Sequence, residues 1–169
     1  TGLPIWDGAI SFTEGVSELD NLIDADSTPV LDGNRIYAVN FQGNLSVFDS
    51  AQRRAVWESK ESSFYEPFIL RGVLGIISAD SKISTYSSRT FENSWKQEEY
   101  ALRELSNPET FKGHILVGDL EGYIHALDPL TGITVARKKI SRNKIITLVS
   151  RSDSFYAIDE KMKLFSLSF

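Results

Sequence analysis

The only two histidines, His114 and His125, stand eleven residues apart, and Asp119 and Glu121 lie between them. Two imidazoles with a carboxylate alongside have the ligand types of a metal site. Each histidine falls within an apolar run of strand length, however, and the acids belong to the turn that separates the two runs. We therefore interpret both histidines as ordinary strand residues and predict no metal site.

The sequence carries none of the familiar catalytic or phosphate-binding motifs. It has no Gly-x-Ser-x-Gly elbow, no Gly-x-x-x-x-Gly-Lys loop and no His-Glu-x-x-His pair. It also has no cysteine, which excludes disulfides, thiolate metal ligands and cysteine nucleophiles. These absences predict a non-catalytic protein without a cofactor.

An acidic stretch at residues 11–28 is the best candidate for binding, and three interpretations of it remain open. It is a solvated connector, a protein contact, or a calcium site formed by Asp20, Asp24 and Asp26. The calcium interpretation lacks the Gly turn and the terminal Glu of an EF-hand loop. Leu22 and its apolar neighbours alternate with the acids, and apolar side chains beside fixed charge favour a protein contact. We predict that Asp20, Leu22, Asp24 and Asp26 bind a partner protein.

The clearest structural unit is residues 108–136, which contain four short apolar runs. The runs are separated by Lys112-Gly113, by 119–122 and by 129–132, and each break has the Gly, Pro or Asp chemistry of a tight turn. The pattern predicts four antiparallel strands.

This unit recurs at 29–57 and 67–95, and the prolines that begin the three copies are 38 and 41 residues apart. A period near 40 with four strands in each unit is the signature of propeller blades. The predicted fold class is all-β, with β-propeller blades of four antiparallel strands. Residues 3–10 are expected to be the outer strand of a preceding blade, and 147–168 three strands of a last blade, so that 1–169 form a partial propeller.

The incomplete blades at the two ends are complementary, and an open sheet edge invites pairing. They can close within one chain as a ring of four blades. They can also close head to tail between two chains as a ring of eight. We favour the homodimer, because a ring of four blades needs much sharper curvature.

Composition bounds the remaining possibilities. The chain has 169 residues, 41% of them hydrophobic, which is enough for a sizeable core. The sequence contains no run of about 18 apolar residues, so it predicts no membrane-spanning helix. The net charge is −5, and residues 1–34 hold seven acids and no Lys or Arg, which argues against a nucleic-acid partner. The chain begins Thr-Gly-Leu-Pro without an initiator Met or a signal segment, so we expect a processed or trimmed piece of a longer protein.

Other recurring residues are best explained by the fold. Trp6, Trp57 and Trp95 share one position in their copies, which favours packing between neighbouring blades. Asp49 and Asp128 follow the third strand at equivalent places, as turn-capping residues do. A basic cluster within 137–144 is interpreted as a solvated connector.

Two sequence patterns resemble known families. Gly-Tyr-Ile-His-Ala-Leu-Asp-Pro-Leu-Thr-Gly at 122–132, with Trp in other copies four residues after the last Gly, resembles the PQQ-like propeller repeat. That family includes quinoprotein dehydrogenases and non-catalytic propellers. Over essentially the whole chain, the order Gly-Leu-Pro-Ile-Trp, Glu-Leu-Asp-Asn-Leu-Ile-Asp-Ala-Asp-Ser-Thr-Pro-Val and Gly-Asn-Leu-Ser-Val-Phe-Asp is similar to the C-terminal half of the BamB family.

This second resemblance implies about half of an eight-bladed ring at the periplasmic face of the outer membrane. It implies a scaffold of the β-barrel assembly machinery that binds a POTRA domain of BamA, with unfolded outer-membrane proteins as further partners. Asp24 and Asp26 would lie in the BamA-contacting surface. The membrane anchor would be a lipid on an N-terminal Cys that this sequence lacks. The alternatives are a fragment of a PQQ-dependent quinoprotein dehydrogenase and a ligand-sensing propeller.

Overall fold

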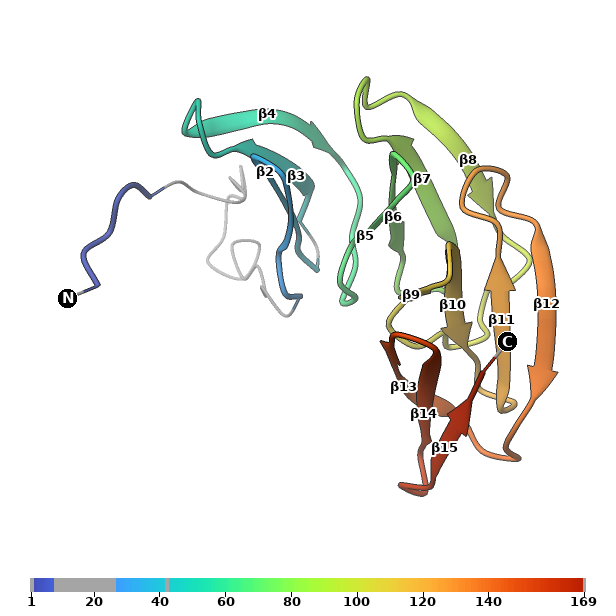
Figure 1. The fold of residues 1–169 in the computed structure, drawn as a ribbon. Helices are drawn as coiled ribbons and strands as arrows, with labels where there is room; N and C mark the ends of the chain where they lie inside the picture. The colour runs from blue at the N-terminus through green and yellow to red at the C-terminus, as the bar shows by residue number, and fades with distance from the viewer. Residues whose placement is uncertain (1, 8–26, 42, 169) are drawn as a thin grey trace, which may run out of the picture. The chain divides into compact units, whose positions relative to one another are not determined.

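The computed structural model describes residues 2–7, 27–41 and 43–168, and in these residues it contains fifteen strands and no helix. The strands form three sheets of four strands and one of three, and every strand pairs antiparallel with its neighbour in the sequence (Figure 1). The predicted all-β fold with four-stranded antiparallel blades is therefore confirmed. The chain divides into two compact units, 1–66 and 67–169, which are described separately.

The first unit contains one complete sheet. Its strands are β1 (Val30–Asp32), β2 (Arg35–Val39), β3 (Leu45–Asp49) and β4 (Arg54–Ser59). The two central strands are the buried ones, and Tyr37, Leu45 and Val47 are almost completely enclosed. A two-residue turn at 33–34 joins β1 to β2 in a register that pairs Val30 with Tyr37. A wider turn at 50–53 joins β3 to β4 and pairs Val47 with Trp57.

The second unit contains three sheets in sequence. The first has β5 (Phe68–Leu70), β6 (Val73–Ile77), β7 (Ile83–Ser87) and β8 (Asn93–Gln97). The second has β9 (Glu109–Phe111), β10 (His114–Gly118), β11 (Tyr123–Leu127) and β12 (Thr134–Lys139). The last has β13 (Ile145–Arg151), β14 (Ser154–Asp159) and β15 (Leu164–Leu167).

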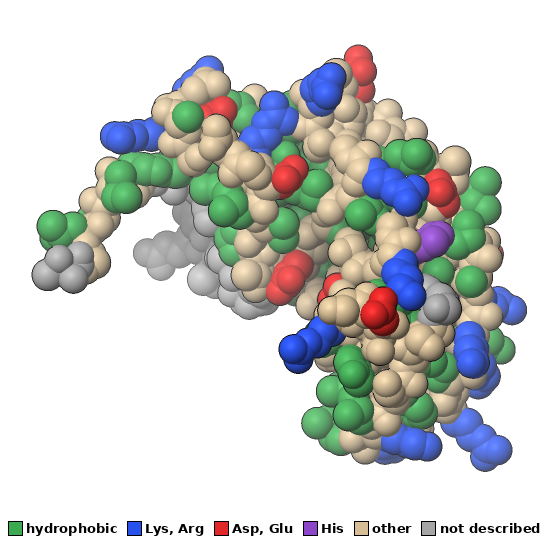
Figure 2. Space-filling model, in the orientation of Figure 1, with side chains coloured by type: hydrophobic (Ala, Val, Ile, Leu, Met, Phe, Trp, Pro, Cys, Tyr) green, Lys and Arg blue, Asp and Glu red, His purple; other side chains and the backbone are tan. Residues whose placement is uncertain are grey.

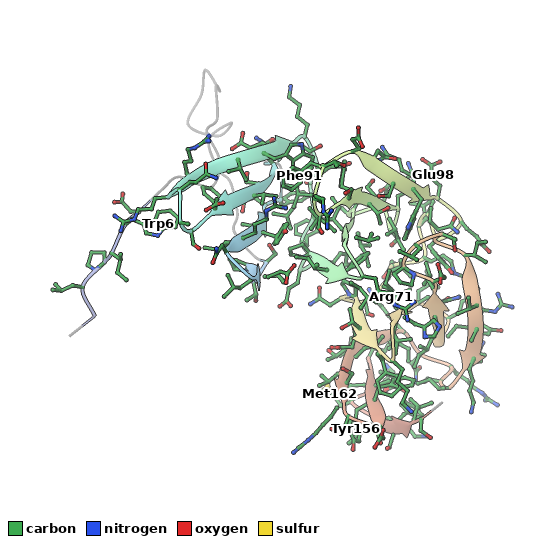
Figure 3. The ribbon with its side chains drawn as sticks, turned by 45° about the horizontal axis from the view of Figure 1, so that its top comes forward. Trp6, Arg71, Phe91, Glu98, Tyr156 and Met162 are labelled. Atoms are coloured by element: carbon green, nitrogen blue, oxygen red, sulfur yellow. The ribbon has the colours of Figure 1, made fainter. Side chains whose placement is uncertain are left out.

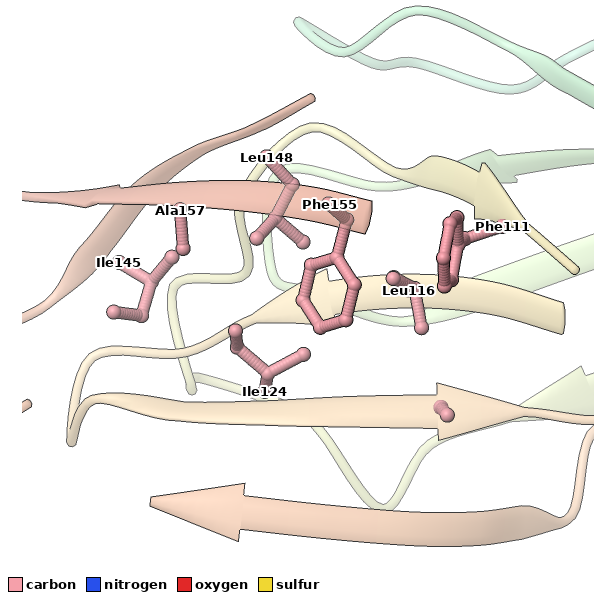
Figure 4. Packing of buried hydrophobic residues seen from close by; sticks show 8 residues of the cluster. Phe111, Leu116, Ile124, Ile145, Leu148, Phe155 and Ala157 are labelled. Carbon is pink, nitrogen blue, oxygen red and sulfur yellow. The ribbon is translucent and has the colours of Figure 1, made fainter. Parts of the chain in front are cut away.

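The last two sheets pack face to face through an apolar core (Figure 4). Leu116 of β10 and Phe155 of β14 are buried in it, and the rings of Phe111 and Phe155 lie 5.2 Å apart. A Cβ at Gly118 would lie 2.4 Å from Cγ2 of Ile145, so the glycine permits this close approach. Truncating one of the large core side chains to Ala should cost about 2–5 kcal/mol of folding free energy.

Trp95 joins the first two sheets of the second unit. Its indole Nε1–H donates to the carbonyl oxygen of Pro129 at 2.9 Å, and its ring lies against Gly132. The prediction that this repeated tryptophan packs between neighbouring blades is confirmed at Trp95. The equivalent Ala136 has no ring, and it lines a pocket of about 320 Å³ between the second and last sheets. That junction is packed differently, as the smaller residue predicts.

The turn-capping prediction for two aspartates is also confirmed. Asp49 Oδ1 accepts the backbone N–H groups of Ala51 and Gln52, each at 2.9 Å. Asp128 Oδ1 accepts the equivalent pair from Leu130 and Thr131. In the blade between them, the Ser87 hydroxyl takes the same place. These side chains satisfy turn N–H groups that no ladder can reach.

The outer strand expected at residues 3–10 is not seen in the part of it that the structure describes. Residues 3–7 form no strand, and 8–10 lie outside the described residues. A strand exists only when its backbone pairs with a neighbour. The Trp6 ring nevertheless lies 6.4 Å from Phe48, beside the end of β3 where the Asp49 turn begins. Closure of the last blade by this segment stays a prediction.

Candidate partner-binding edge

The predicted site residues Asp20, Leu22, Asp24 and Asp26 lie outside the described residues. The described chain resumes at Ser27, directly after Asp26. The Ser27 hydroxyl donates to the carbonyl oxygen of Val39 at the end of β2. The C-terminal end of the acidic stretch is therefore tied to one end of the first sheet.

A serine at the equivalent place anchors the connector of the second unit, through different hydrogen bonds to the last residue of the second strand. The Ser106 N–H donates to the Gly118 carbonyl at 2.9 Å, and the Gly118 N–H donates to the Ser106 hydroxyl at 3.0 Å. Both Ser27 and Ser106 stand two residues before the proline that begins their copy. The acidic stretch and residues 98–107 therefore hold equivalent places in their copies, and each ends at a serine that is anchored on the second strand of the next sheet.

The hairpins between the second and third strands form the other part of this edge. In each sheet, a residue at the end of the second strand or directly after it donates its N–H to the carbonyl of the residue before or at the start of the third strand. The four donor and acceptor pairs are Asn40 and Asn44, Ser78 and Lys82, Asp119 and Tyr123, and Asp159 and Lys163. We call the connectors 98–107 and 140–144, with hairpins 78–82, 119–122 and 159–163, the connector edge.

Asp119 is the centre of a buried ionic cluster on this edge. Its Oδ2 accepts Nη2 of Arg103 at 2.7 Å and Nε2 of His125 at 2.8 Å. Its Oδ1 accepts the backbone N–H groups of Glu121 and Tyr123. Arg103 comes from the connector and also reaches the Glu121 carboxylate at 2.9 Å. The cluster therefore clamps the connector onto the hairpin.

The protonation states in this cluster follow from burial and from its hydrogen bonds. Burial would raise the pKa of Asp119, but the bonds from His125, Arg103 and the Tyr123 N–H outweigh it and lower the pKa. Burial lowers the pKa of His125, although the neighbouring carboxylate opposes this. Near neutral pH the cluster holds an ionised Asp119, a neutral His125 and a charged Arg103. Neutral His125 then donates its Nε2–H to the carboxylate.

An aspartate bonded to a histidine is also one part of a hydrolytic triad, but this pair is built for structure. His125 is only 2% exposed, and its ring lies 4.8 Å from Tyr100, so a substrate cannot reach it. Tyr100 is itself held by a hydrogen bond to the Thr134 hydroxyl. His125 pairs across the strands with Val117, three positions from His114, and an odd offset places the two histidines on opposite faces. This geometry agrees with their interpretation as separate strand residues. Among the described residues, no three His, Cys, Asp or Glu side chains are grouped so that they could hold a metal ion.

The second described connector is held by another aspartate at the equivalent position. Asp159 Oδ2 accepts the Ser141 hydroxyl at 2.7 Å and the Asn143 amide at 3.3 Å. Its Oδ1 accepts the N–H groups of Lys161 and Lys163. An acid after the second strand thus fixes a connector in two successive sheets. This period-40 signal is readable in the sequence, although our sequence interpretation did not use it.

Between the anchors, the connector turns apolar and charged side chains outward. Leu102 is 78% exposed and has a left-handed backbone, with φ of 62°. Its N–H donates to the Asp80 carbonyl of the preceding hairpin at 2.8 Å. A leucine with a left-handed backbone destabilises the fold through backbone strain, and the surrounding hydrogen bonds must offset that free energy. The connector edge therefore presents fixed side chains on a rigid base, as a protein-binding surface requires.

Comparison with known proteins identifies the family. The family model described as outer membrane protein assembly factor BamB matches residues 1–97. The chain belongs to this family. The curated relatives described next carry the name outer membrane protein assembly factor BamB.

Individual BamB relatives agree with the family model. The outer membrane protein assembly factor BamB of Pseudomonas aeruginosa is 32% identical over 144 residues, which are 85% of this chain and 38% of that protein. The BamB of Salmonella typhimurium is 29% identical over 95% of this chain and 41% of its own length. The crystal structure of BamB from Moraxella catarrhalis matches with a TM-score of 0.89 and 27% identity, over 99% of this chain and 50% of that one. The chain spans half or less of the BamB proteins that it matches.

More distant likenesses concern the fold alone. A quinohemoprotein alcohol dehydrogenase from Comamonas testosteroni matches 68% of this chain with a TM-score of 0.57 and 18% identity. The blade architecture is thus shared with dehydrogenases, while the sequence family is that of assembly factors. Within the described residues, no helix has the length and apolar character needed to cross a membrane.

Proposed function

We propose that this chain is part of a non-catalytic scaffold of the outer-membrane β-barrel assembly machinery. In this role it works at the periplasmic face of the outer membrane, in a protein that is lipid-anchored through another part of its sequence. It binds a POTRA domain of BamA and aids the insertion of outer-membrane proteins. Membership of the BamB family is the observation that carries the proposal.

The acidic connector is the proposed BamA-binding element. Asp24 and Asp26 lie three residues and one residue before Ser27, whose hydroxyl is anchored on Val39. In the equivalent connector, the residue three positions before the anchoring serine is Arg103, on the connector edge. This sequence register supports the proposal that Asp24 takes part in the contact. Asp20 and Leu22 complete the proposed contact.

A titration of this chain with the POTRA region of BamA tests the proposal. Changing Asp24→Arg and Asp26→Arg together should weaken binding, because two acids that meet a basic partner become repulsive. Glu58→Arg with Asp153→Arg is the matched control, since it makes the same charge change at two exposed acids outside residues 11–28 of the sequence. Unchanged affinity in the Asp24 and Asp26 variant would show that the contact lies elsewhere.

We further propose that two copies of this chain close head to tail. The sheet of β13–β15 has three strands, whereas the other three sheets have four. The outer edge of β15 therefore offers an unpaired backbone, and residues 3–10 of a second copy can complete the sheet. Size-exclusion chromatography with light scattering measures the outcome directly. A species of 19.0 kDa, the mass of one chain, would rule out the homodimer.

A further inference from the structure

The second unit carries a concentration of positive charge that the proposed function does not use. Residues 134–163 hold eight Lys and Arg against three Asp and Glu, although the whole chain holds 18 against 23. Figure 2 shows Lys and Arg side chains gathered over the part of the molecule that contains β12 and the last sheet. Seven of these side chains are exposed, and apart from Arg151 they are the six considered below: Arg137, Lys138, Lys139, Arg142, Lys161 and Lys163.

Three of the six line a hollow of about 610 Å³ at the connector edge. Lys139 comes from the end of β12, Arg142 from the connector and Lys163 from the hairpin before β15. We call this feature the basic hollow. Its cations come from three elements and two sheets, so their meeting is a product of the fold.

None of the six cations forms an ion pair with an acid in the described part of the chain, unlike the other basic residues of the connector edge. Lys82 pairs with Asp80 at 2.9 Å, and Lys144 pairs with Glu104 at 2.8 Å. Arg103 is held by Asp119, as described above. Like charges collected without counter-charges repel one another, and an anionic partner removes that repulsion.

The only acid that lines the basic hollow is already occupied. Asp159 is 1% exposed, and its two carboxylate oxygens together accept four hydrogen bonds. Those bonds hold the connector and hairpin in place, and they lower the pKa of Asp159, chiefly through the Ser141 hydroxyl. Asp159 therefore lines the hollow without pairing with its cations. Lys139 and Lys163 lie over the rings of Tyr123 and Phe165, at 4.9 and 5.0 Å from the ring centres, which leaves their charges available to an external anion.

We propose that the basic hollow binds an acidic segment of a partner protein. Carboxylate side chains of the partner enter the hollow and meet Lys139, Arg142 and Lys163. The exposed Met162 and Leu164, which flank Lys163 in the sequence, add apolar contact. Met and Arg are enriched in protein interfaces, so Met162 and Arg142 suit a contact with a protein.

Shape favours a protein over a membrane surface. A bilayer presents a broad plane of phosphates, which projecting cations reach best. In this chain three cations line a recess, and a protruding side chain fits that geometry. In Figure 3, Met162 and Tyr156 mark the last sheet beside this edge. This inference does not rest on the BamA proposal. The acidic connector would bind a basic surface of its partner, whereas the basic hollow would bind an acidic segment.

Binding of a blocked synthetic peptide of alternating Glu and Leu, followed by fluorescence anisotropy at low salt, tests the proposal on the whole chain. The hollow variant is Arg142→Glu with Lys163→Glu. Its control is Arg89→Glu with Lys96→Glu, which makes the same charge change on exposed residues of the first sheet of the second unit. We expect the hollow variant to bind at least about fivefold more weakly, and the control to match the wild type. Binding should weaken as salt is added.

Three results would overturn the proposal. The first is equal peptide affinity in the hollow variant and its control. The second is displacement of the peptide by inorganic phosphate, which would show a small-anion site. The third is binding to vesicles of phosphatidylglycerol, lost in the hollow variant, without binding of the peptide. A milder variant, Arg142→Gln with Lys163→Gln, keeps the test valid if the charge reversal unfolds the chain, and it should show an intermediate affinity.

Discussion

Acidification should destabilise this protein between pH 7 and pH 5 through one histidine. Only two histidines are present, and histidine is the side chain whose ordinary pKa, about 6.5, lies in this range. His125 is buried, and burial lowers its pKa in the folded chain. Between the folded and unfolded pKa values, the unfolded chain binds a proton that the folded chain does not. Falling pH therefore favours unfolding.

The size of the effect follows from this difference of a single proton. The free energy of unfolding should fall by at most about 1.4 kcal/mol for each pH unit, beginning near the unfolded pKa of about 6.5. The loss ends once pH is below the lowered pKa of His125 in the folded chain. Asp119 adds a second loss at more acidic pH. Its pKa is also lowered in the folded chain, so its contribution disappears as pH falls from about 3.9 through that lower value.

Urea unfolding at several pH values, followed by tryptophan fluorescence, measures this dependence. His125→Gln keeps an N–H that can donate to Asp119 and removes the titration, so it should flatten the slope between pH 7 and pH 5. His114→Gln is the matched control because it removes the other histidine, and we expect it to retain more of the slope than His125→Gln does. If the two variants have the same pH dependence, or if the wild type gains stability on acidification, the assignment to His125 is wrong.

Two further pairs of variants test the connector clamp and the tryptophan junction by urea unfolding near neutral pH. Asp119→Ala should cost about 3–5 kcal/mol, because it leaves a buried histidine and two turn N–H groups without their acceptor. Asp128→Ala removes an equivalent but exposed turn cap and should cost much less; equal losses would contradict the role of the clamp. Gly132→Ala should cost about 1–3 kcal/mol more than Gly72→Ala, since both have positive φ but only the first places a Cβ 2.6 Å from the Trp95 ring. Equal losses in the two glycine variants would show that the Trp95 contact is easily displaced.

The repeat made most of the fold predictable. Strand runs, turn residues and a period near 40 are local signals, and each blade is built from neighbours in the sequence. For this reason the sequence predicts Asp49 and Asp128 as caps and Trp95 as a junction residue, and their contacts agree. The segment at 3–7 behaved differently, since a leading strand depends on a partner from elsewhere rather than on its own residues.

The connector edge was less predictable, because its contacts join residues that are distant in sequence. Arg103 lies 16 residues before Asp119 and belongs to a different element. Lys139 and Lys163 are 24 residues apart in the sequence, and only the packing of two sheets brings them to one hollow. The sequence signalled a basic cluster at 137–144 but not the side chains that complete it from the next sheet.

One hairpin position explains why the connectors can carry different functions on the same scaffold. The residue at this position, which ends or directly follows the second strand, makes the same backbone hydrogen bond whether it is Asn40, Ser78, Asp119 or Asp159. The side-chain partners of the two aspartates differ, since Asp119 binds Arg103 and Asp159 binds residues of 140–144.

The anchor therefore fixes where a connector runs without fixing what it turns outward. Leu102 and Arg142 are exposed between such anchors, and neither contributes to the core of a blade. Substituting either residue should alter binding and leave the free energy of unfolding nearly unchanged. Surface substitutions of this kind rarely change that free energy by more than about 0.5 kcal/mol. The same reasoning applies to Asp24 and Asp26, which precede the anchored Ser27. The connectors, and not the best-formed strands, are where partner specificity in this protein should be sought.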